Sequence, residues 1–152
     1  MPANPKNKIW PPSTFASASA DGPPKLSEGR PKHEVRRRIK FWFPVFICMG
    51  LIFFASSIRQ ENIVFLFSFQ DVVFHTLAYL ILAVFFARAL KNTNPNIAAL
   101  QILIFTIVFG VAYGLSDEFH QSFVSGRSVS GFDVFMDGAG SVFGGLLYQW
   151  LR

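Results

Sequence analysis

Charged side chains are scarce in most of this chain, and their scarcity excludes an ordinary soluble domain. Only 15% of the 152 residues are charged, 51% are hydrophobic, and phenylalanine alone occurs 19 times. Nine of the 14 Lys and Arg residues lie in the first 40 positions, so mostly long uncharged runs follow Lys40. A soluble domain of this length carries more charge, spread along the chain. We therefore predict an integral membrane protein.

A single cysteine excludes an internal disulfide and a thiolate metal cluster. Cys48 lies inside an apolar run, and we interpret it as a packing residue. The pI near 9.7 does not indicate nucleic-acid binding, because the cluster Arg36, Arg37, Arg38 and Lys40 directly precedes an apolar run. Basic clusters in this place are typical of the cytoplasmic side of a membrane, where they meet anionic lipids. We predict membrane lipids as partners and no nucleic acid.

The first part of the chain lacks apolar periodicity. Residues 1–38 are rich in Pro, Ser, Ala and basic side chains, and the pairs Pro11-Pro12 and Pro23-Pro24 block regular structure. We predict a disordered basic cytoplasmic tail over 1–38 and a helical transmembrane domain over 39–152. No apolar stretch follows the first basic residues, which disfavours a cleaved signal peptide, while an organellar transit peptide stays open.

Four apolar segments follow the tail, at about residues 41–58, 72–90, 97–116 and 132–151. Each is near the ~20 residues that cross a ~30 Å hydrocarbon core. Only helices satisfy their backbone hydrogen bonds in lipid at this segment length. The sequence therefore predicts an all-α bundle of about four transmembrane helices. The alternative for the last segment is a helix that lies in the membrane plane.

Basic residues set the expected orientation. The tail, the turn with Arg88 and Lys91, and Arg152 should face the cytoplasm, because cytoplasmic loops carry an excess of Lys and Arg. The loops at 59–71 and 117–133 should then face outward. We predict a multi-pass protein of the bacterial inner membrane with both termini in the cytoplasm.

This topology brings polar residues from distant segments to one depth. At a rise of 1.5 Å per residue, His75 lies roughly 20 Å above Arg88, and Asp137 roughly 22 Å above Arg152. We expect His75 and Asp137 to face each other beneath a lid formed by the loop at 117–130. Ionisable groups inside a membrane are expensive, and they mark functional sites by default.

Plainer roles stay open for these residues. His75 could be a hydrogen-bonded polar residue near the interface, and Asp117 and Glu118 could be a solvated helix end. Asp137 needs a partner inside an apolar span, and Arg127 is the expected one, because a guanidinium can grip a carboxylate with two hydrogen bonds. Such a pair could simply staple the loop.

The full candidate site is a set of ligand-binding or structural polar residues, with no catalytic residue assigned. Its members are Asp71, His75, Tyr79, Asp117, Glu118, His120, Gln121, Arg127, Ser130, Asp133 and Asp137. The first three fall at i, i+4 and i+8, on one helix face. Tyr79, like the many phenylalanines, could equally be a core or lipid-facing residue. The pairs Gly110/Gly114 and Gly140/Gly144 have the spacing that lets membrane helices approach closely.

The order of these motifs resembles the VanZ-like family over residues 71–144. The motifs are Asp71-x3-His75-x3-Tyr79, Asp117-Glu118-x-His120-Gln121, Gly126-Arg127-x2-Ser130-x2-Asp133 and Gly140-x3-Gly144. The resemblance implies a small multi-span membrane protein with a cell-envelope role, since the family takes its name from an accessory protein of resistance to teicoplanin-type glycopeptides. Two positions depart from the family pattern: Val72 stands where Lys is common, and Asp137 where Asn is common.

Three functions fit the sequence. The first is a non-enzymatic protein whose outward polar site, with Arg127, binds an envelope lipid, a lipid-linked cell-wall precursor or a lipoglycopeptide. The second is a membrane enzyme on a lipid-linked substrate, with His75, Glu118, His120 and Asp137 as metal ligands or general acids and bases. The third is a small transporter. There is no His-Glu-x-x-His motif and no serine nucleophile elbow. We predict no cofactor, while a bound metal and a homo-oligomer stay open.

Overall fold

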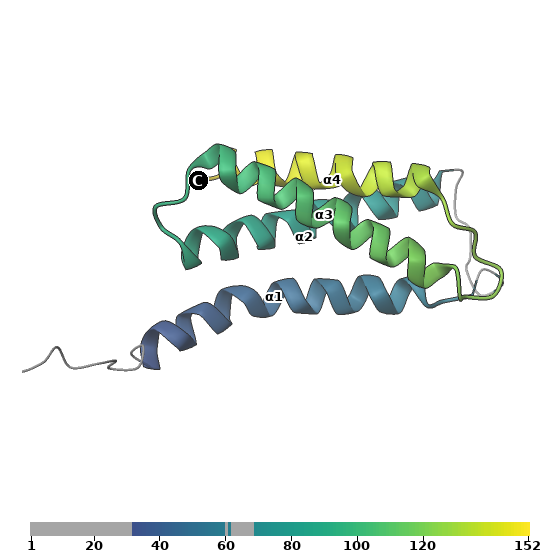
Figure 1. Ribbon diagram of the computed structural model, residues 1–152, viewed down its shortest axis with the longest axis horizontal. Coiled ribbons are helices and arrows are strands. Elements are labelled where there is room, and N and C mark those ends of the chain that lie inside the picture. Colours follow the sequence, from purple (N-terminus) through teal and green to yellow (C-terminus); the bar gives the residue numbers. More distant parts are fainter. Residues whose placement is uncertain (1–31, 60, 62–68) are drawn as a thin grey trace, which may run out of the picture. The chain divides into compact units, whose positions relative to one another are not determined.

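The computed structural model describes residues 32–59, 61 and 69–152, and these residues form four helices and no strand (Figure 1). The helices are α1 (Lys32–Ser56), α2 (Gln70–Thr93), α3 (Ala99–Gln121) and α4 (Gly131–Trp150). The predicted all-α fold class is confirmed. The tail expected at 1–38 lies largely outside the described residues.

Two helix boundaries differ from the expected ones. Helix α1 begins at Lys32, whereas the sequence analysis placed the start of the helical domain at residue 39. The basic residues before the apolar run are good helix formers and extend it. Pro44 therefore lies in the interior of α1 instead of its opening turns. Helix α3 continues through Gln121, past its expected end at 116, so the loop between α3 and α4 is shorter than predicted.

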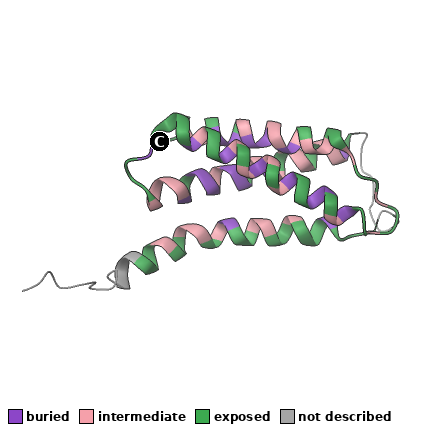
Figure 2. Ribbon diagram, viewed as in Figure 1, coloured by how far each residue is buried: buried purple, intermediate pink, exposed green. Residues whose placement is uncertain are grey.

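Helices α1, α2 and α3 are long and apolar enough to cross a membrane, by length and composition. Many large apolar side chains on all four helices are exposed, as a lipid-facing surface requires and a soluble monomer rarely shows. In Figure 2 the buried residues concentrate on the faces where α2, α3 and α4 meet, while α1 is mostly exposed or half-buried. The protein is an integral membrane protein.

Helix α4 runs alongside α2, in the same direction, through two glycines. A Cβ atom added at Gly140 would overlap the carbonyl oxygen of Thr76, and one at Gly144 would overlap that of Leu80. The two backbones can touch only because both positions lack a side chain. The predicted role of this glycine pair in close helix approach is confirmed, and α4 is a member of the bundle along its length.

The second glycine pair, on α3, receives the neighbouring face of α4. Gly110 of α3 lies against the side chain of Ser141, and Gly114 lies against that of Asp137. Near the other end of this antiparallel contact, the Gln149 side chain donates a hydrogen bond to the backbone oxygen of α3's first residue, 2.9 Å away. Helices α2, α3 and α4 thus form one closely packed unit, in which α4 packs against both of the others.

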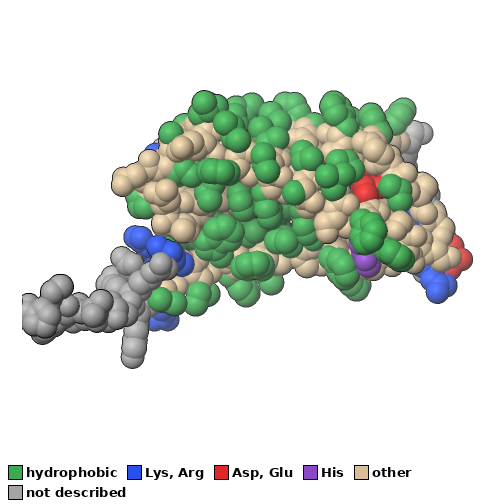
Figure 3. Space-filling view, in the orientation of Figure 1, with side chains coloured by type: hydrophobic (Ala, Val, Ile, Leu, Met, Phe, Trp, Pro, Cys, Tyr) green, Lys and Arg blue, Asp and Glu red, His purple; other side chains and the backbone are tan. Residues whose placement is uncertain are grey.

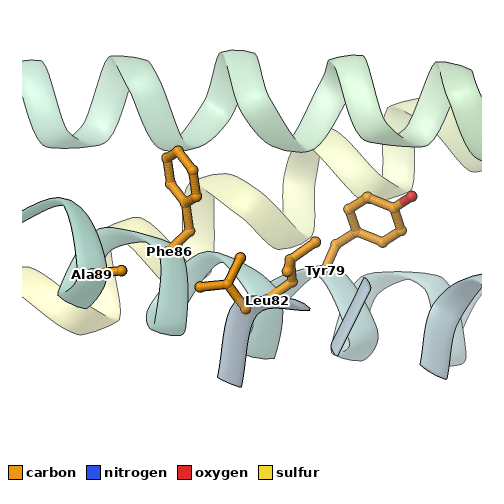
Figure 4. Close-up of a cluster of buried hydrophobic side chains, with 5 residues drawn as sticks. Tyr79, Leu82, Phe86 and Ala89 are labelled. Atoms are coloured by element: carbon orange, nitrogen blue, oxygen red, sulfur yellow. The ribbon is translucent and has the colours of Figure 1, made fainter. Parts of the chain in front are cut away.

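Helix α1 packs on this unit mainly through aromatic and aliphatic side chains. Val45 joins a buried cluster with Tyr79, Leu82, Phe86 and Ala89 of α2, and Figure 4 shows these four along one face of that helix. In the first half of α1, the Trp42 indole donates a hydrogen bond to the hydroxyl of Thr93, the last residue of α2, 2.8 Å away. Farther along α1, the Tyr113 hydroxyl donates to the backbone oxygen of Met49, 2.7 Å away.

The two ends of the bundle differ in charge. Arg88 lies over the ring of Phe41 near the start of α1, 5.2 Å from its centroid, and Lys91 donates to the backbone of the α2–α3 turn. Figure 3 shows Lys and Arg side chains gathered at this end, with the acidic side chains in view at the other. The start of α1 and the C-terminal end of α4 both lie at the basic end (Figure 1).

Candidate functional site

His75 and Asp137 form the centre of the polar end. The Nδ1 atom of His75 lies 2.9 Å from Oδ1 of Asp137. Asp137 is fully buried, and the histidine side chain is 13% exposed. The expectation that these two residues face each other is confirmed. Their contact depends on the glycines at 114 and 140, which let α3 and α2 close around the aspartate.

Asp117 and Gln121 form a second buried pair, one helical turn apart on α3. The Gln121 amide donates to Oδ2 of Asp117 across 3.0 Å, and both residues are less than 5% exposed. A solvated helix end would leave Asp117 and Glu118 in water, so that plainer reading is wrong. Both acids sit on the last turns of a helix and point into the bundle.

Glu118 connects α3 to the start of α4. Its Oε2 accepts a hydrogen bond from the backbone N–H of Ser130, 2.6 Å away. The Ser130 hydroxyl accepts in turn from the backbone N–H of Asp133, the usual cap of a helix N-terminus. Ser130 and Asp133 are therefore placed by capping, and Glu118 fixes the loop end above the His75–Asp137 pair. The lid was predicted at 117–130, but the loop comprises only residues 122–130, because 117–121 belong to α3.

Arg127 pairs with no acid among the described residues, and the expected pairing with Asp137 is wrong. Its Nε and Nη2 atoms lie 3.2 and 3.4 Å from the backbone oxygens of Ile58 and Ala55. Ala55 lies in the last turn of α1 and Ile58 just beyond its end, where the helix dipole favours a cation. Arg127 thus ties the lid to α1.

His120 stands apart from the other predicted residues. Its Nε2 atom lies 3.0 Å from the Ser57 hydroxyl, and its ring packs against that of Phe53 with centroids 4.2 Å apart. The metal-ligand set that combined His120 with His75, Glu118 and Asp137 is therefore not assembled. Tyr79 is 1% exposed and packs near the ring of Tyr113, so it is a core residue.

Four buried oxygens at this end have no hydrogen-bond partner within the described part of the chain. They are Tyr79 Oη, Asp117 Oδ1, Glu118 Oε1 and Asp137 Oδ2. A buried carboxylate oxygen without a donor or a cation is costly, and such exceptions in a well-packed structure call for a reason. The cluster therefore has unused acceptor capacity for a donor or a cation.

An open cleft of about 480 Å³ reaches this cluster between α1 and α2. Apolar side chains make up most of its wall, including Leu51, Ile52, Phe74, Leu77 and Ile81. Its polar lining consists of Ser56, Gln70, Asp71, His75, Tyr79, Asp117, Gln121 and Arg127. The cleft has the size of a ligand site and combines apolar walls with a few convergent polar groups.

The contribution of α1 to this site was missed by the sequence analysis. Leu51, Ile52, Ala55, Ser56 and Ile58 line the cleft, yet this stretch carries no ionisable residue that could mark it. The adjacent serines Ser56 and Ser57 were the one available signal. Ser57 contacts His120, and Ser56 is 5% exposed.

Residues 41–152 match the model of the VanZ/LLP1 family. The match covers more than half of the chain and includes α1 from residue 41 onward, beyond the 71–144 stretch of the motifs. No curated protein matches the chain, and no solved structure matches it. The chain therefore belongs to the VanZ/LLP1 family.

Proposed function

We propose that this VanZ/LLP1 family protein is a non-enzymatic membrane protein that binds one amphiphile, an envelope lipid or a lipid-linked cell-wall precursor, in the cleft between α1 and α2. The observation that carries the proposal is the division of the cleft into a long apolar wall and one polar end. A ligand with a hydrocarbon chain and a polar head group matches both parts.

The apolar part of the cleft is open to the side. The wall residues Leu51, Phe74, Leu77 and Ile81 are 63%, 52%, 49% and 48% exposed, so their free surfaces face the region that lipid chains fill. Between Asp71 and Ile81 the cleft extends roughly 15 Å along α2, about half of a bilayer's hydrocarbon core. A chain from the adjacent leaflet can therefore lie in it.

The polar end offers both charges to a head group. Arg127 lines the cleft and donates its hydrogen bonds to carbonyl oxygens. Among the described residues no carboxylate neutralises its positive charge. Asp71 and Asp117 line the same end and favour amine or hydroxyl donors. The combination suits a zwitterionic or hydroxylated phosphate head group better than a purely anionic one.

The proposal includes an orientation that is consistent with an envelope role. By the positive-inside rule we place the basic end of the bundle and both termini on the cytoplasmic side, so the proposal puts the cleft's polar end in the outer leaflet of a bacterial cytoplasmic membrane. The family resemblance adds a link to teicoplanin-type glycopeptides, which also carry a lipid chain. We include tolerance of such drugs in the proposal, as a consequence of amphiphile binding.

The direct test is ligand retention by the purified protein. The protein in detergent is equilibrated separately with phosphatidylethanolamine, phosphatidylglycerol and an undecaprenyl-linked cell-wall precursor, and native mass spectrometry counts the bound molecules. We expect one molecule of a preferred ligand per chain. Ala55→Trp, which places an indole in the cleft, should lower this occupancy at least tenfold.

Ala112→Trp is the matched control, because Ala112 is an exposed α3 residue outside the cleft. It should retain the ligand like the wild type. The absence of specific retention for all three probes, or equal retention by Ala55→Trp, contradicts the proposal. In cells, loss of the gene should lower the inhibitory concentration of teicoplanin, and an unchanged concentration would remove the resistance role alone.

A further inference from the structure

We propose that His75, Glu118 and Asp133 bind one divalent transition-metal ion at the polar end of the bundle. One ligand atom from each of these three side chains lies within 4.8 Å of the other two. They come from α2, α3 and α4, so the ion would join the three helices of the closely packed unit. This inference does not rest on amphiphile binding, because the ion can bind whether or not the cleft is filled.

The hydrogen bond from His75 to Asp137 prepares the histidine for a metal. An ionised Asp137 can only accept, so it favours the tautomer with the proton on Nδ1, 2.9 Å away, which leaves the Nε2 lone pair for a metal. Histidines that ligate metals usually donate their other ring N–H to a carboxylate or a carbonyl, which fixes the ring and raises its basicity. Asp137 fills this role from a fully buried position.

Glu118 supplies a buried carboxylate oxygen that takes part in no hydrogen bond of the described fold. The residue is 3% exposed, its Oε2 accepts from the Ser130 backbone, and its Oε1 has no partner among the described residues. The backbone hydrogen bond keeps the carboxylate pointed at the cluster. A cation satisfies the remaining oxygen, which otherwise stays buried and unpaired.

Asp133 completes the set from the first turn of α4. It is half-buried, so an ion can enter along its side chain from the loop side. Its backbone is held by the Ser130 cap, while its carboxylate is left for other contacts. The side chains of His75 and Glu118 are thus each oriented by a hydrogen bond, and Asp133 is positioned through its backbone.

A ligand set of one imidazole and two carboxylates suits Zn²⁺ or Mn²⁺, since imidazole favours the former and carboxylate the latter. Ligand atoms on a tetrahedral Zn²⁺ are ~3.3 Å apart, given bonds of ~2.0–2.2 Å. The three side chains would therefore close inward by up to ~1.5 Å on binding. Three protein ligands leave one position open, as in sites where the ion also meets a ligand or water.

The ion would change what the cleft can hold. His75 is both a wall residue of the cleft and a ligand of the proposed site, so the ion lies beside the polar end. The end is otherwise rich in carboxylates, which repel phosphate. A divalent cation there reverses the local charge and offers a direct contact to a phosphate oxygen, alongside Arg127.

The test is metal content and affinity of the full-length protein in detergent. After treatment with a chelator and dialysis, the protein is titrated with Zn²⁺ alone and with Mn²⁺ alone. Bound metal is measured by inductively coupled plasma mass spectrometry. We expect one equivalent of one of these ions per chain. Glu118→Gln and Asp133→Asn should each weaken binding at least tenfold, and Asp137→Asn by ~10–100-fold as an outer-shell change.

His120→Ala and Glu61→Gln are matched controls, because both residues lie outside the proposed ligand set. Both should bind the ion like the wild type. A folded wild-type protein that takes up less than a tenth of an equivalent of either ion overturns the proposal. Equal losses in Asp133→Asn and His120→Ala would also overturn it. Asp133→Asn keeps the interpretation clear if Glu118→Gln fails to fold, since Asp133 is only half-buried.

Discussion

Replacing Gly140 by alanine should separate α4 from α2 and disturb the polar centre. The new methyl would lie 3.1 Å from the backbone nitrogen of Leu80 and 3.2 Å from the carbonyl carbon of Thr76, and would overlap the Thr76 oxygen. Comfortable contacts need ~3.5–4.0 Å, and backbone atoms cannot rotate away, so the helices must part by up to ~1 Å. The same shift would stretch the 2.9 Å contact between His75 and Asp137 beyond the usual range of hydrogen bonds.

The expected net loss of unfolding free energy is about 2 kcal/mol. Overpacking of this kind costs ~1–3 kcal/mol, and rigid backbone neighbours place Gly140→Ala at the upper end. The higher helix propensity of alanine returns up to ~1 kcal/mol. At Gly50 of α1 no atom lies within 4 Å of an added Cβ, so Gly50→Ala should be neutral or stabilising by up to that amount.

Reversible unfolding in mixed micelles with increasing SDS, followed by circular dichroism, measures both variants. The two free energies should differ by roughly 2–3 kcal/mol, with Gly140→Ala below the wild type and Gly50→Ala equal to it or above it. If Gly140→Ala proves as stable as Gly50→Ala, the close approach of α2 and α4 is not the basis of the site, and the reasoning fails.

Three other substitutions test separate contacts. His75→Ala should lower the unfolding free energy by ~3–5 kcal/mol, because it leaves the buried Asp137 without its partner. In an Asp137→Asn background the same substitution should cost only ~1–2 kcal/mol. Equal losses in the two backgrounds of this double-mutant cycle would refute the pairing. Arg127→Ala should lower the unfolding free energy by ~1 kcal/mol, because it removes the hydrogen bonds to backbone oxygens at the end of α1. It should also reduce amphiphile retention in native mass spectrometry. Full retention would show that the guanidinium only holds the lid against α1. Trp42→Phe removes the hydrogen bond to Thr93, far from the polar end of the cleft, so it should lower the unfolding free energy by ~1 kcal/mol. Amphiphile retention should be unchanged. Lower retention would mean that the two ends of the bundle are coupled.

Spacing arguments predicted the parts of the site that lie on one helix or at one depth. The rise per residue placed His75 and Asp137 at the same level, and the structure joins them by a hydrogen bond. Glycine spacing identified the faces through which α3 and α4, and α2 and α4, come together. Both arguments succeed because helix geometry is nearly constant, so depth and face follow from counting residues.

Other parts required tertiary information. Arg127 was expected to pair with a carboxylate, the usual preference of a guanidinium, but it donates instead to backbone oxygens at the end of α1. Asp117 and Glu118 looked like loop residues because acids often end helices, whereas Gln121 and Ser130 supply donors that let them stay helical and buried. The apolar wall from α1 carries no distinctive residue type, and only the packing of helices reveals it.

The composition of α4 has a consequence for how the chain enters the membrane. This helix is not among the segments apolar enough to span a bilayer alone, and it carries Asp133, Asp137 and Ser141. An aspartate near the middle of an isolated span opposes insertion by ~2.5–3.5 kcal/mol. The partner that satisfies Asp137 and the surfaces that receive α4 are on α2 and α3, which leave the ribosome earlier. We therefore expect α4 to insert stably only after α2 and α3 have entered the membrane.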